Sequence, residues 1–259
     1  ELGRLVRELF IPDDNAFWGT FDYSQQEPRL TVHYSSLTKQ LGAQQAVEEY
    51  QNEEADFHQI VADMAGIDRK KAKMINLGLS YGMGRQKLTM SLGISEVEAE
   101  QLFARYHKRV PFIRGLTNAC MRKASNKGFI TTLLGRRCRF NLYEPQGERG
   151  IPLPYDQAVA KWGERGLVRA YTYKALNRLI QGSAADMTKR AMLDLWKEGY
   201  VPYVQVHDEL DLGISTKKET EQIKEIMENC VKLQVPNIVD IEIGKSWGTA
   251  IKSYQEVFK

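Results

Sequence analysis

The chain has 259 residues, 42% of them hydrophobic and 27% charged, which predicts a globular protein with one large domain or two interleaved domains. Its 36 Lys and Arg against 33 Asp and Glu give a net charge of +3, which is too small to identify a polyanionic partner. The three cysteines, Cys120, Cys138 and Cys230, are far apart and form no Cys-x-x-Cys pair, which excludes a disulfide framework or a zinc site and favours a reduced, intracellular compartment.

The opening of the chain is charged and has no initiator Met, and no apolar run approaches membrane-spanning length. We therefore expect neither a signal peptide nor a membrane anchor, and we expect a fragment or a processed chain. Function has to be read from the distribution of residues along the sequence.

The first predicted element is a strand over residues 16–24, an apolar, β-prone run that ends at Asp22. Pro28 then falls in the first turn of a helix predicted through Leu37, where its missing N–H costs nothing. An acid at such a junction can be a metal ligand or a turn residue. A second carboxylate converging on the same point would favour the metal.

Residues 38–66 have a helical pattern, in which His58 lies next to an apolar stripe. That position favours a surface histidine over a phosphate-facing donor. The stretch 68–83 reads as a helix with Asp68 as its N-cap and Gly82 as its stop, and four of its residues recur at every fourth position: Arg69, Lys73, Leu77 and Tyr81. Cations and a ring on one stripe suit a phosphate-bearing ligand with a flat base, although a solvated basic face over buried side chains has the same pattern.

The middle of the chain begins with scaffolding helices, one opened by a Ser95–Glu98 capping box and one opened by Pro111 and ending near Gly128. A hairpin is predicted over residues 129–140, with arginines at the start of its second strand that suit a phosphate backbone or protect an exposed edge. Residues 141–173 are the most irregular part. We predict a loop-rich insertion there, with one short helix near residues 157–162.

A long helix is predicted from about residue 173 to 198, with a polar pair, Asn177 and Gln181, one turn apart. Small residues at 182–185 allow a close approach to the backbone. Residues 203–212 read as two β runs joined at His207-Asp208. Neighbours in a strand point to opposite faces, so we assign Asp208 to a metal and Glu209 to a supporting position. A final strand near residues 238–244 completes an α+β layout, in which strands from both ends of the chain share one sheet.

Three of these stretches together resemble the polymerase motifs of family-A DNA polymerases, the group of bacterial DNA polymerase I and many phage replicases. They are Asp22-Tyr-Ser-Gln-Gln-Glu-Pro-Arg29, then Arg69-x-x-x-Lys73 with Tyr81-Gly82, then Gln205-Val-His-Asp-Glu209. The resemblance also covers residues 3–12, 135–137, 181–186 and 244–247, and it is weak from 141 to 173.

This resemblance implies an α+β fold with a polymerase palm, built from a small antiparallel sheet with packed helices, and a mostly helical fingers subdomain. The palm would comprise residues 1–38 and 129–259, with the loop-rich insertion at 141–173, and the fingers would comprise residues 39–128. On the same resemblance, we expect no thumb and no exonuclease domain within this chain.

The implied activity is that of a template-directed DNA polymerase, which adds a dNTP to a primer 3′-hydroxyl and releases pyrophosphate. Two Mg²⁺ ions would be held by Asp22, Asp208 and the backbone carbonyl of Tyr23. Lys73, placed to neutralise or protonate the leaving group, and Glu209 complete the implied catalytic set. The residues implied to contact the incoming nucleotide are Arg69, Lys73, His58, Leu77, Tyr81, Glu27 and Gln25. Those implied to contact primer–template DNA are Arg136, Asn177, Gln181, Gln205, His207 and Arg29.

The sequence departs from the family at Leu77, where Phe or Tyr is usual, and at Gln26 and Pro28, which replace apolar residues. A single-subunit RNA polymerase is one alternative, but Glu27 would crowd a ribose 2′-hydroxyl. A catalytically silent nucleic-acid-binding module of a replication complex is another, but it would not need Asp22 and Asp208. We expect processivity or replisome proteins as further partners, no membrane, and the cytoplasm of a bacterial or phage-infected cell, or an organelle.

Overall fold

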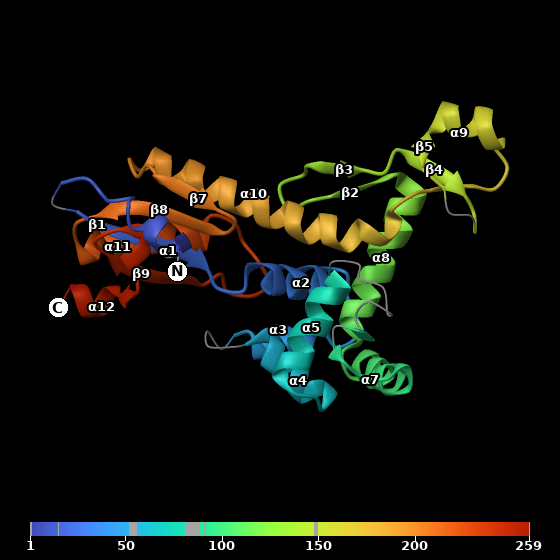
Figure 1. Cartoon of the computed structure of the whole chain (residues 1–259), viewed down its shortest axis with the longest axis horizontal. Coiled ribbons are helices and arrows are strands. Elements are labelled where there is room, and N and C mark those ends of the chain that lie inside the picture. The colour runs from blue at the N-terminus through green and yellow to red at the C-terminus, as the bar shows by residue number, and fades with distance from the viewer. Residues whose placement is uncertain are drawn as a thin grey trace. The chain divides into compact units, whose positions relative to one another are not determined.

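Strands from the two ends of the chain pair in one sheet, as the sequence predicts. The computed structural model describes residues 2–14, 16–51, 56–80, 89–90, 92–147 and 150–258 (Figure 1). It divides into two units, the sheet unit (Glu1–Arg29 with Ala184–Lys259) and the helical unit (Leu30–Ser183). The boundaries fall inside α2 (Gln26–Leu37) and inside α10 (Ala175–Lys197).

The sheet unit is built around β1 (Phe17–Tyr23), which pairs with β8 (Glu209–Ile214) on one side and β9 (Val239–Gly244) on the other. β7 (Val204–Val206) and β10 (Lys252–Ser253) form the edges, so that the order is β10-β9-β1-β8-β7 and every pair is antiparallel. Helix α11 (Lys217–Asn229) is capped by Thr216, and the short helices are α1 (Leu2–Arg7), η2 (Trp247–Thr249) and α12 (Tyr254–Val257).

The two faces of the central strands differ in polarity because side chains alternate across a sheet. Phe21, Leu210 and Ile243 lie on the buried face, which is apolar. The opposite face carries acids, including Asp22 and Asp240, both exposed. The fold therefore buries one face as core, whereas the other face is mixed, with Trp18, Thr20 and Asp211 buried and Asp22 and Asp240 exposed.

The helical unit contains the helices that the sequence predicts between residues 26 and 128. These are α3 (Ala43–Glu49), α4 (Phe57–Ala65), α5 (Arg69–Ser80), α7 (Glu96–Arg109) and α8 (Pro111–Lys127). The Ser95–Glu98 capping box is present, and α8 ends at Gly128, whose φ of 75° satisfies a left-handed cap. No helix among the described residues combines the length and the apolar character needed to cross a membrane.

The hairpin is confirmed as β2 (Phe129–Thr131) and β3 (Arg137–Arg139). Within residues 141–173 the short helix predicted near residues 157–162 is confirmed as α9 (Tyr155–Trp162), and the segment also contains short strands that were not predicted. These strands form a three-stranded sheet of β5 (Leu153–Pro154), β4 (Leu142–Pro145) and β6 (Leu167–Arg169), and the turn η1 (Thr172–Lys174) follows. Strands of two to four residues are too short to show an alternating pattern, and prolines at their ends mask them further.

Candidate active site

A row of carboxylates crosses the mixed face of the sheet unit. Asp22, next to last in β1, is paired with Glu209 of β8 and with Asp240 of β9. Directly paired residues of antiparallel strands point to the same face, so the three side chains are neighbours. The turn that precedes β8 adds Asp208, because the backbone N–H of Tyr23 lies 3.5 Å from the Asp208 carbonyl.

The crowding of these acids changes the protonation of Asp22. The pKa of Asp22 is raised to about 7, first by partial burial of its carboxyl group and then by the negative charges of Asp208, Glu209 and Asp240. The nearby His207 lowers this pKa in part. The side chain itself remains exposed, so a cation from solvent can reach it. Like charges held together in this way favour a bound proton or a bound metal ion.

The turn between β7 and β8 holds Asp208 in a strained but well-bonded geometry. His207 has a φ of 55°, which is unusual for a residue other than Gly, Asn or Asp. Its Nδ1 lies 2.7 Å from Asp208 Oδ1, and this hydrogen bond raises the pKa of His207. Gln205 donates from Nε2 to the His207 carbonyl at 2.6 Å, and His207 Nε2 lies 4.0 Å from Glu27 Oε1. The turn thus brings four of the predicted residues together.

Glu209 is held by an indole, which fixes it beside the carboxylate row. Trp247 Nε1 donates to Glu209 Oε1 at 3.1 Å. Two residues further along the same face, Asp211 is fully buried and accepts from Trp18 Nε1 at 3.0 Å. Asp211 lies outside the motifs that predict the site, although an acid between two leucines in a strand is a signal that could have found it.

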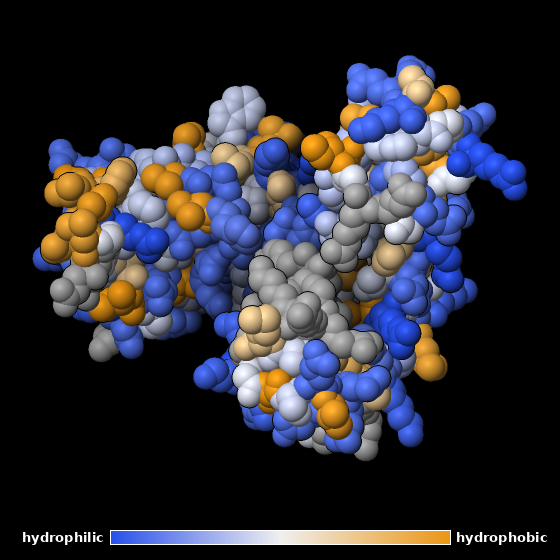
Figure 2. Space-filling model, turned by 45° about the vertical axis from the view of Figure 1, so that its right-hand side comes forward, coloured by the Kyte–Doolittle hydropathy of each residue, from blue (hydrophilic) through white to orange (hydrophobic). Residues whose placement is uncertain are grey.

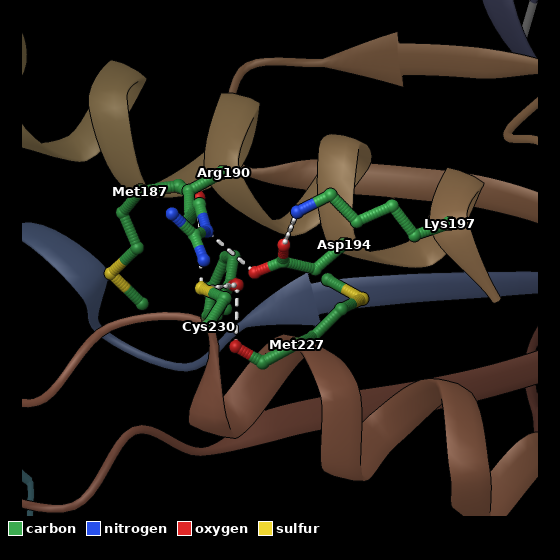
Figure 3. Close-up of polar contacts among 7 residues, drawn as sticks. Met187, Arg190, Asp194, Lys197, Met227 and Cys230 are labelled. Atoms are coloured by element: carbon green, nitrogen blue, oxygen red, sulfur yellow. Dashed lines mark hydrogen bonds and ion pairs between the residues drawn. The ribbon is translucent and has the colours of Figure 1, made fainter.

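The end of β1 is anchored from the opposite face through the Tyr23 ring. The Tyr23 hydroxyl donates to the Met227 carbonyl at 2.8 Å and lies 3.3 Å from Cys230 Sγ. Figure 3 shows Met227 and Cys230 beneath α10, where Asp194 binds both Arg190 and Lys197. These contacts immobilise the backbone of Tyr23, whose carbonyl is the predicted third ligand.

Arg29 differs from expectation in its surroundings. Arg29 is 1% exposed and donates to the backbone carbonyls of Ser24 and Pro236 at 2.9 and 2.8 Å. A guanidinium used in this way supports the loop after β1, which favours a structural role over the predicted contact with DNA. Gln25 is half-buried and has a φ of 54° at that same turn.

The helical unit contains the predicted cations of α5. Lys73 is exposed, and Arg69 binds the helix-capping carboxylate of Asp56 at 2.6 Å. The expectation of a surface His58 is wrong: the ring is buried, and its Nδ1 lies 3.2 Å from Asn76 Nδ2. Burial, opposed by Asp56 and reinforced by Arg69 and Lys73, lowers the pKa of His58.

Leu77 lies within α5, and Tyr81 lies outside the described residues.

The predicted DNA contacts in the helical unit cluster where the hairpin meets α10. Arg136 Nη2 donates to the Gly182 carbonyl at 2.7 Å, Gln181 is exposed and Asn177 is half-buried. Gly182 is needed for close packing, since a Cβ there would lie 2.7 Å from Thr132 Cγ2.

The metal-binding capacity of the site rests on few groups. Across the described ranges, no three His, Cys, Asp or Glu side chains converge closely enough to hold a metal ion by themselves. Asp22, Asp208 and the Tyr23 carbonyl are instead two carboxylates and a backbone oxygen, which are hard oxygen donors of the kind that Mg²⁺ and Ca²⁺ prefer.

Comparison with known proteins places these features in context. The family model described as DNA polymerase family A matches residues 1–249. The chain is 38% identical to a DNA-directed DNA polymerase of Pseudomonas phage M6, and 33% identical to DNA polymerase I of Streptococcus pneumoniae. These alignments cover 96% and 95% of the chain but 40% and 28% of the relatives, so the chain spans less than half of either protein.

A solved structure is also similar. The POL domain of Pol1 from M. smegmatis, in complex with DNA primer-template and dNTP, matches with a TM-score of 0.77 and 29% identity. The match covers 96% of this chain and 43% of that one. The likeness therefore extends over both units of the chain.

Proposed function

Since this chain belongs to DNA polymerase family A, we propose that it is the catalytic core of a template-directed DNA polymerase, which joins a dNTP to a primer 3′-hydroxyl and releases pyrophosphate. The observation that carries the proposal is the pairing of Asp22 with Glu209, next to the contact between the Tyr23 N–H and the Asp208 carbonyl, within a family match over nearly the whole chain. The structural relative, which holds primer-template and dNTP, supports the choice of substrates.

Two Mg²⁺ ions fit the residues present. Asp22, Asp208 and the Tyr23 carbonyl would hold them, and burial together with the neighbouring carboxylates, which raise the pKa of Asp22, fits a site whose negative charge a cation would offset. When bound, the ions acidify the primer 3′-hydroxyl and neutralise the triphosphate. The protein positions the ligands: the Tyr23 hydroxyl anchors β1, His207 orients Asp208, and Trp247 orients Glu209.

For the incoming nucleotide, we propose that Arg69, Lys73 and His58 contact the triphosphate. The exposed Lys73 ammonium would supply charge or a proton to the leaving pyrophosphate. Arg69 would exchange its bond to Asp56 for phosphate oxygens. Leu77, Tyr81, Glu27 and Gln25 stay predicted contacts of the incoming nucleotide.

For DNA, we propose contacts from Arg136, Asn177, Gln181, Gln205 and His207, with amides reading minor-groove acceptors that every base pair shares. The division into a palm of residues 1–38 and 129–259 and fingers of residues 39–128 stays a prediction. Processivity or replisome proteins, and the cytoplasm of a bacterial or phage-infected cell, are part of the same proposal.

Primer extension by the full-length protein that contains this chain tests the proposal against its two alternatives. We expect extension that needs template, dNTP and Mg²⁺, and that is weak with rNTP. Extension with rNTP at a comparable rate would identify an RNA polymerase. DNA binding with no extension under either condition would identify a catalytically silent module, and in both cases our proposal fails.

A further inference from the structure

The chain's entire positive surplus lies in one short segment. The 38 residues from Arg137 to Lys174, which we name the basic lobe, contain seven Lys and Arg and four Asp and Glu. The other 221 residues have no net charge, because they contain 29 Lys and Arg and 29 Asp and Glu. The lobe comprises β3, the β5-β4-β6 sheet, α9 and η1, all in the helical unit, and its β4, β5 and α9 are labelled at the upper right of Figure 1.

Aromatic rings are interleaved with these cations. The guanidinium of Arg169 lies 4.9 Å from the centroid of the Tyr143 ring, and Lys161 Nζ lies 4.9 Å from that of Trp162. Lys174 Nζ lies between two rings, 4.9 Å from Tyr171 and 5.7 Å from Tyr173. Figure 2 shows, at its upper right, mostly hydrophilic side chains with hydrophobic ones among them on this part of the molecule.

Some of these side chains stabilise the lobe through hydrogen bonds within it. Arg169 donates from Nη1 to the Phe140 carbonyl at 2.8 Å, and the Tyr155 hydroxyl donates to Glu164 at 2.7 Å. Others face solvent: the Tyr173 side chain is 48% exposed, Lys174 next to it is exposed, and Arg137 and Arg139 on β3 of the same lobe are exposed as well. A left-handed Tyr171, with a φ of 60°, turns the chain so that both tyrosines flank Lys174.

This combination fits a particular ligand. An exposed ring can stack on a base only if the base is unpaired, and the adjacent cations match the phosphates of the same strand. A protein partner would favour an apolar centre with fewer charges, whereas a Lys ammonium lies against both of these tyrosine rings and the lobe carries further exposed arginines. We propose that the basic lobe binds single-stranded DNA, with Tyr173 and Tyr171 as a stacking platform and Lys174, Arg139 and Arg137 as phosphate contacts.

The proposal goes beyond the polymerase function, because it assigns a ligand to the part of the chain where the family motifs are weakest. It also does not depend on catalysis. Binding is measured without nucleotide or metal, by the fluorescence anisotropy of a labelled oligo-dT titrated with the protein. The Asp22→Ala variant, which lacks a proposed metal ligand, should bind the oligonucleotide as the parent does.

Tyr173→Ala should weaken binding of oligo-dT by about ten- to a hundred-fold, the range for loss of one stacked base. Tyr173→Phe, which keeps the ring, should bind like the parent. The matched control is Trp196→Ala, an aromatic that is 65% exposed on α10 outside the lobe, and it should change nothing. Thermal melting of each variant checks that the fold is intact.

The charge contribution has its own signature. Replacing Arg139 and Lys174 with Gln should reduce the slope of log affinity against log salt by about 1.4, at about 0.7 for each phosphate contact on a single strand. The control replaces Lys217 and Lys218 of α11, both exposed, and should leave the slope unchanged. Tyr173→Ala should leave the slope unchanged as well, since stacking releases no counterions.

Three outcomes would overturn the proposal. Parental affinity in Tyr173→Ala and in the double Gln variant would show that the lobe does not bind DNA. An equal loss with the Trp196 or Lys217/Lys218 controls would show non-specific binding. An equal loss on a duplex of the same length would assign the surface to paired DNA and not to single strands.

Discussion

At the scale of single residues, the two proposed metal ligands should separate chemistry from binding. Asp22→Ala or Asp208→Ala should lower primer extension by at least about a hundred-fold, because each removes an oxygen donor on which charge neutralisation depends. DNA affinity should stay within a few-fold of the parent, since neither carboxylate attracts phosphate. Asp240→Ala, from the same row of acids on β9, is the matched control and should extend normally.

Extension rates and DNA dissociation constants, measured on the same preparations, decide this prediction. A loss of extension that follows a loss of DNA binding would contradict it. A loss in Asp240→Ala equal to that in Asp22→Ala would show that the whole row, and not the β1 end and the turn, forms the site.

Asp211 gives a pH dependence of stability. Burial, and then the charge of Glu209, raise its pKa to about 7, although the bond from Trp18 and the charge of Arg7 lower it. The folded state therefore holds a proton between pH 4 and 7 that the unfolded state releases, and this group's contribution to stability falls as pH rises through that window. Asp211→Asn keeps an oxygen acceptor for Trp18 and removes the ionisation.

We expect Asp211→Asn to be more stable than the parent at pH 8 by a few kcal/mol, about 1.4 for each unit of pKa shift, and closer to the parent at pH 5. Urea unfolding at both pH values measures this. Asp240→Asn, an exposed acid, should not reproduce the difference. A constant difference at the two pH values would mean that Asp211 ionises normally in the folded protein.

Glu27 bears on the choice of sugar. It lies on the first turn of α2, 4.0 Å from His207 at the turn that holds Asp208, so its carboxylate is next to the proposed metal site. Glu27→Ala should raise rNTP incorporation relative to dNTP, because it removes the bulk that would meet a 2′-hydroxyl. Single-nucleotide extension with each substrate tests this, and an unchanged ratio would remove Glu27 from sugar selection.

At the scale of elements, the contact between the hairpin and α10 should tolerate no added carbon. A Cβ at Gly182 would lie 2.7 Å from Thr132 Cγ2, so Gly182→Ala should destabilise the protein by about 1–3 kcal/mol. The double variant with Thr132→Ser lacks that methyl group and should recover much of the loss. Gly3→Ala, on α1 with nothing within 4 Å, is the control and should not destabilise.

Urea unfolding of the four variants gives the coupling energy directly. Additive effects of Gly182→Ala and Thr132→Ser would show that the two positions do not touch in solution. Full stability in Gly182→Ala alone would show that the hairpin can shift at no cost.

Elements with long, periodic patterns were predictable from the sequence. β1 and α8 carry their own boundary signals, an acid-terminated apolar run in one and a proline and a glycine at the ends of the other. β4, β5 and β6 were not predicted, because their few residues pair only with each other and leave no periodic trace. His58 was misjudged for a related reason: its partner Asn76 is on α5, and Tyr106 of α7 donates to that same amide.

At the scale of the whole molecule, the order of the motifs along the chain predicted more residues of the candidate site than any local pattern did. Asp22 and Asp208 are 186 residues apart, and only the pairing of β1 with β8 makes them neighbours. Asp211 escaped notice because its burial depends on Trp18, from the opposite end of the chain. A local sequence pattern does not show which distant segments will surround a side chain, so its burial and partners cannot be predicted from that pattern.

Global stability should respond to Mg²⁺ if the carboxylate row is a metal site. The acids around Asp22 repel one another in the folded state, and a divalent ion that binds only that state stabilises it by RT ln(1 + [Mg²⁺]/Kd). At a concentration ten times Kd this is about 1.4 kcal/mol, which corresponds to a rise of a few degrees in Tm for a chain of this size.

Calorimetry or fluorescence melting in Mg²⁺ and in NaCl of equal ionic strength separates specific binding from screening. The rise should be lost in EDTA and reduced in Asp22→Asn and Asp208→Asn, whereas Asp240→Asn should keep it. An equal rise in NaCl, or one that survives in both ligand variants, would mean that Mg²⁺ acts elsewhere on the chain.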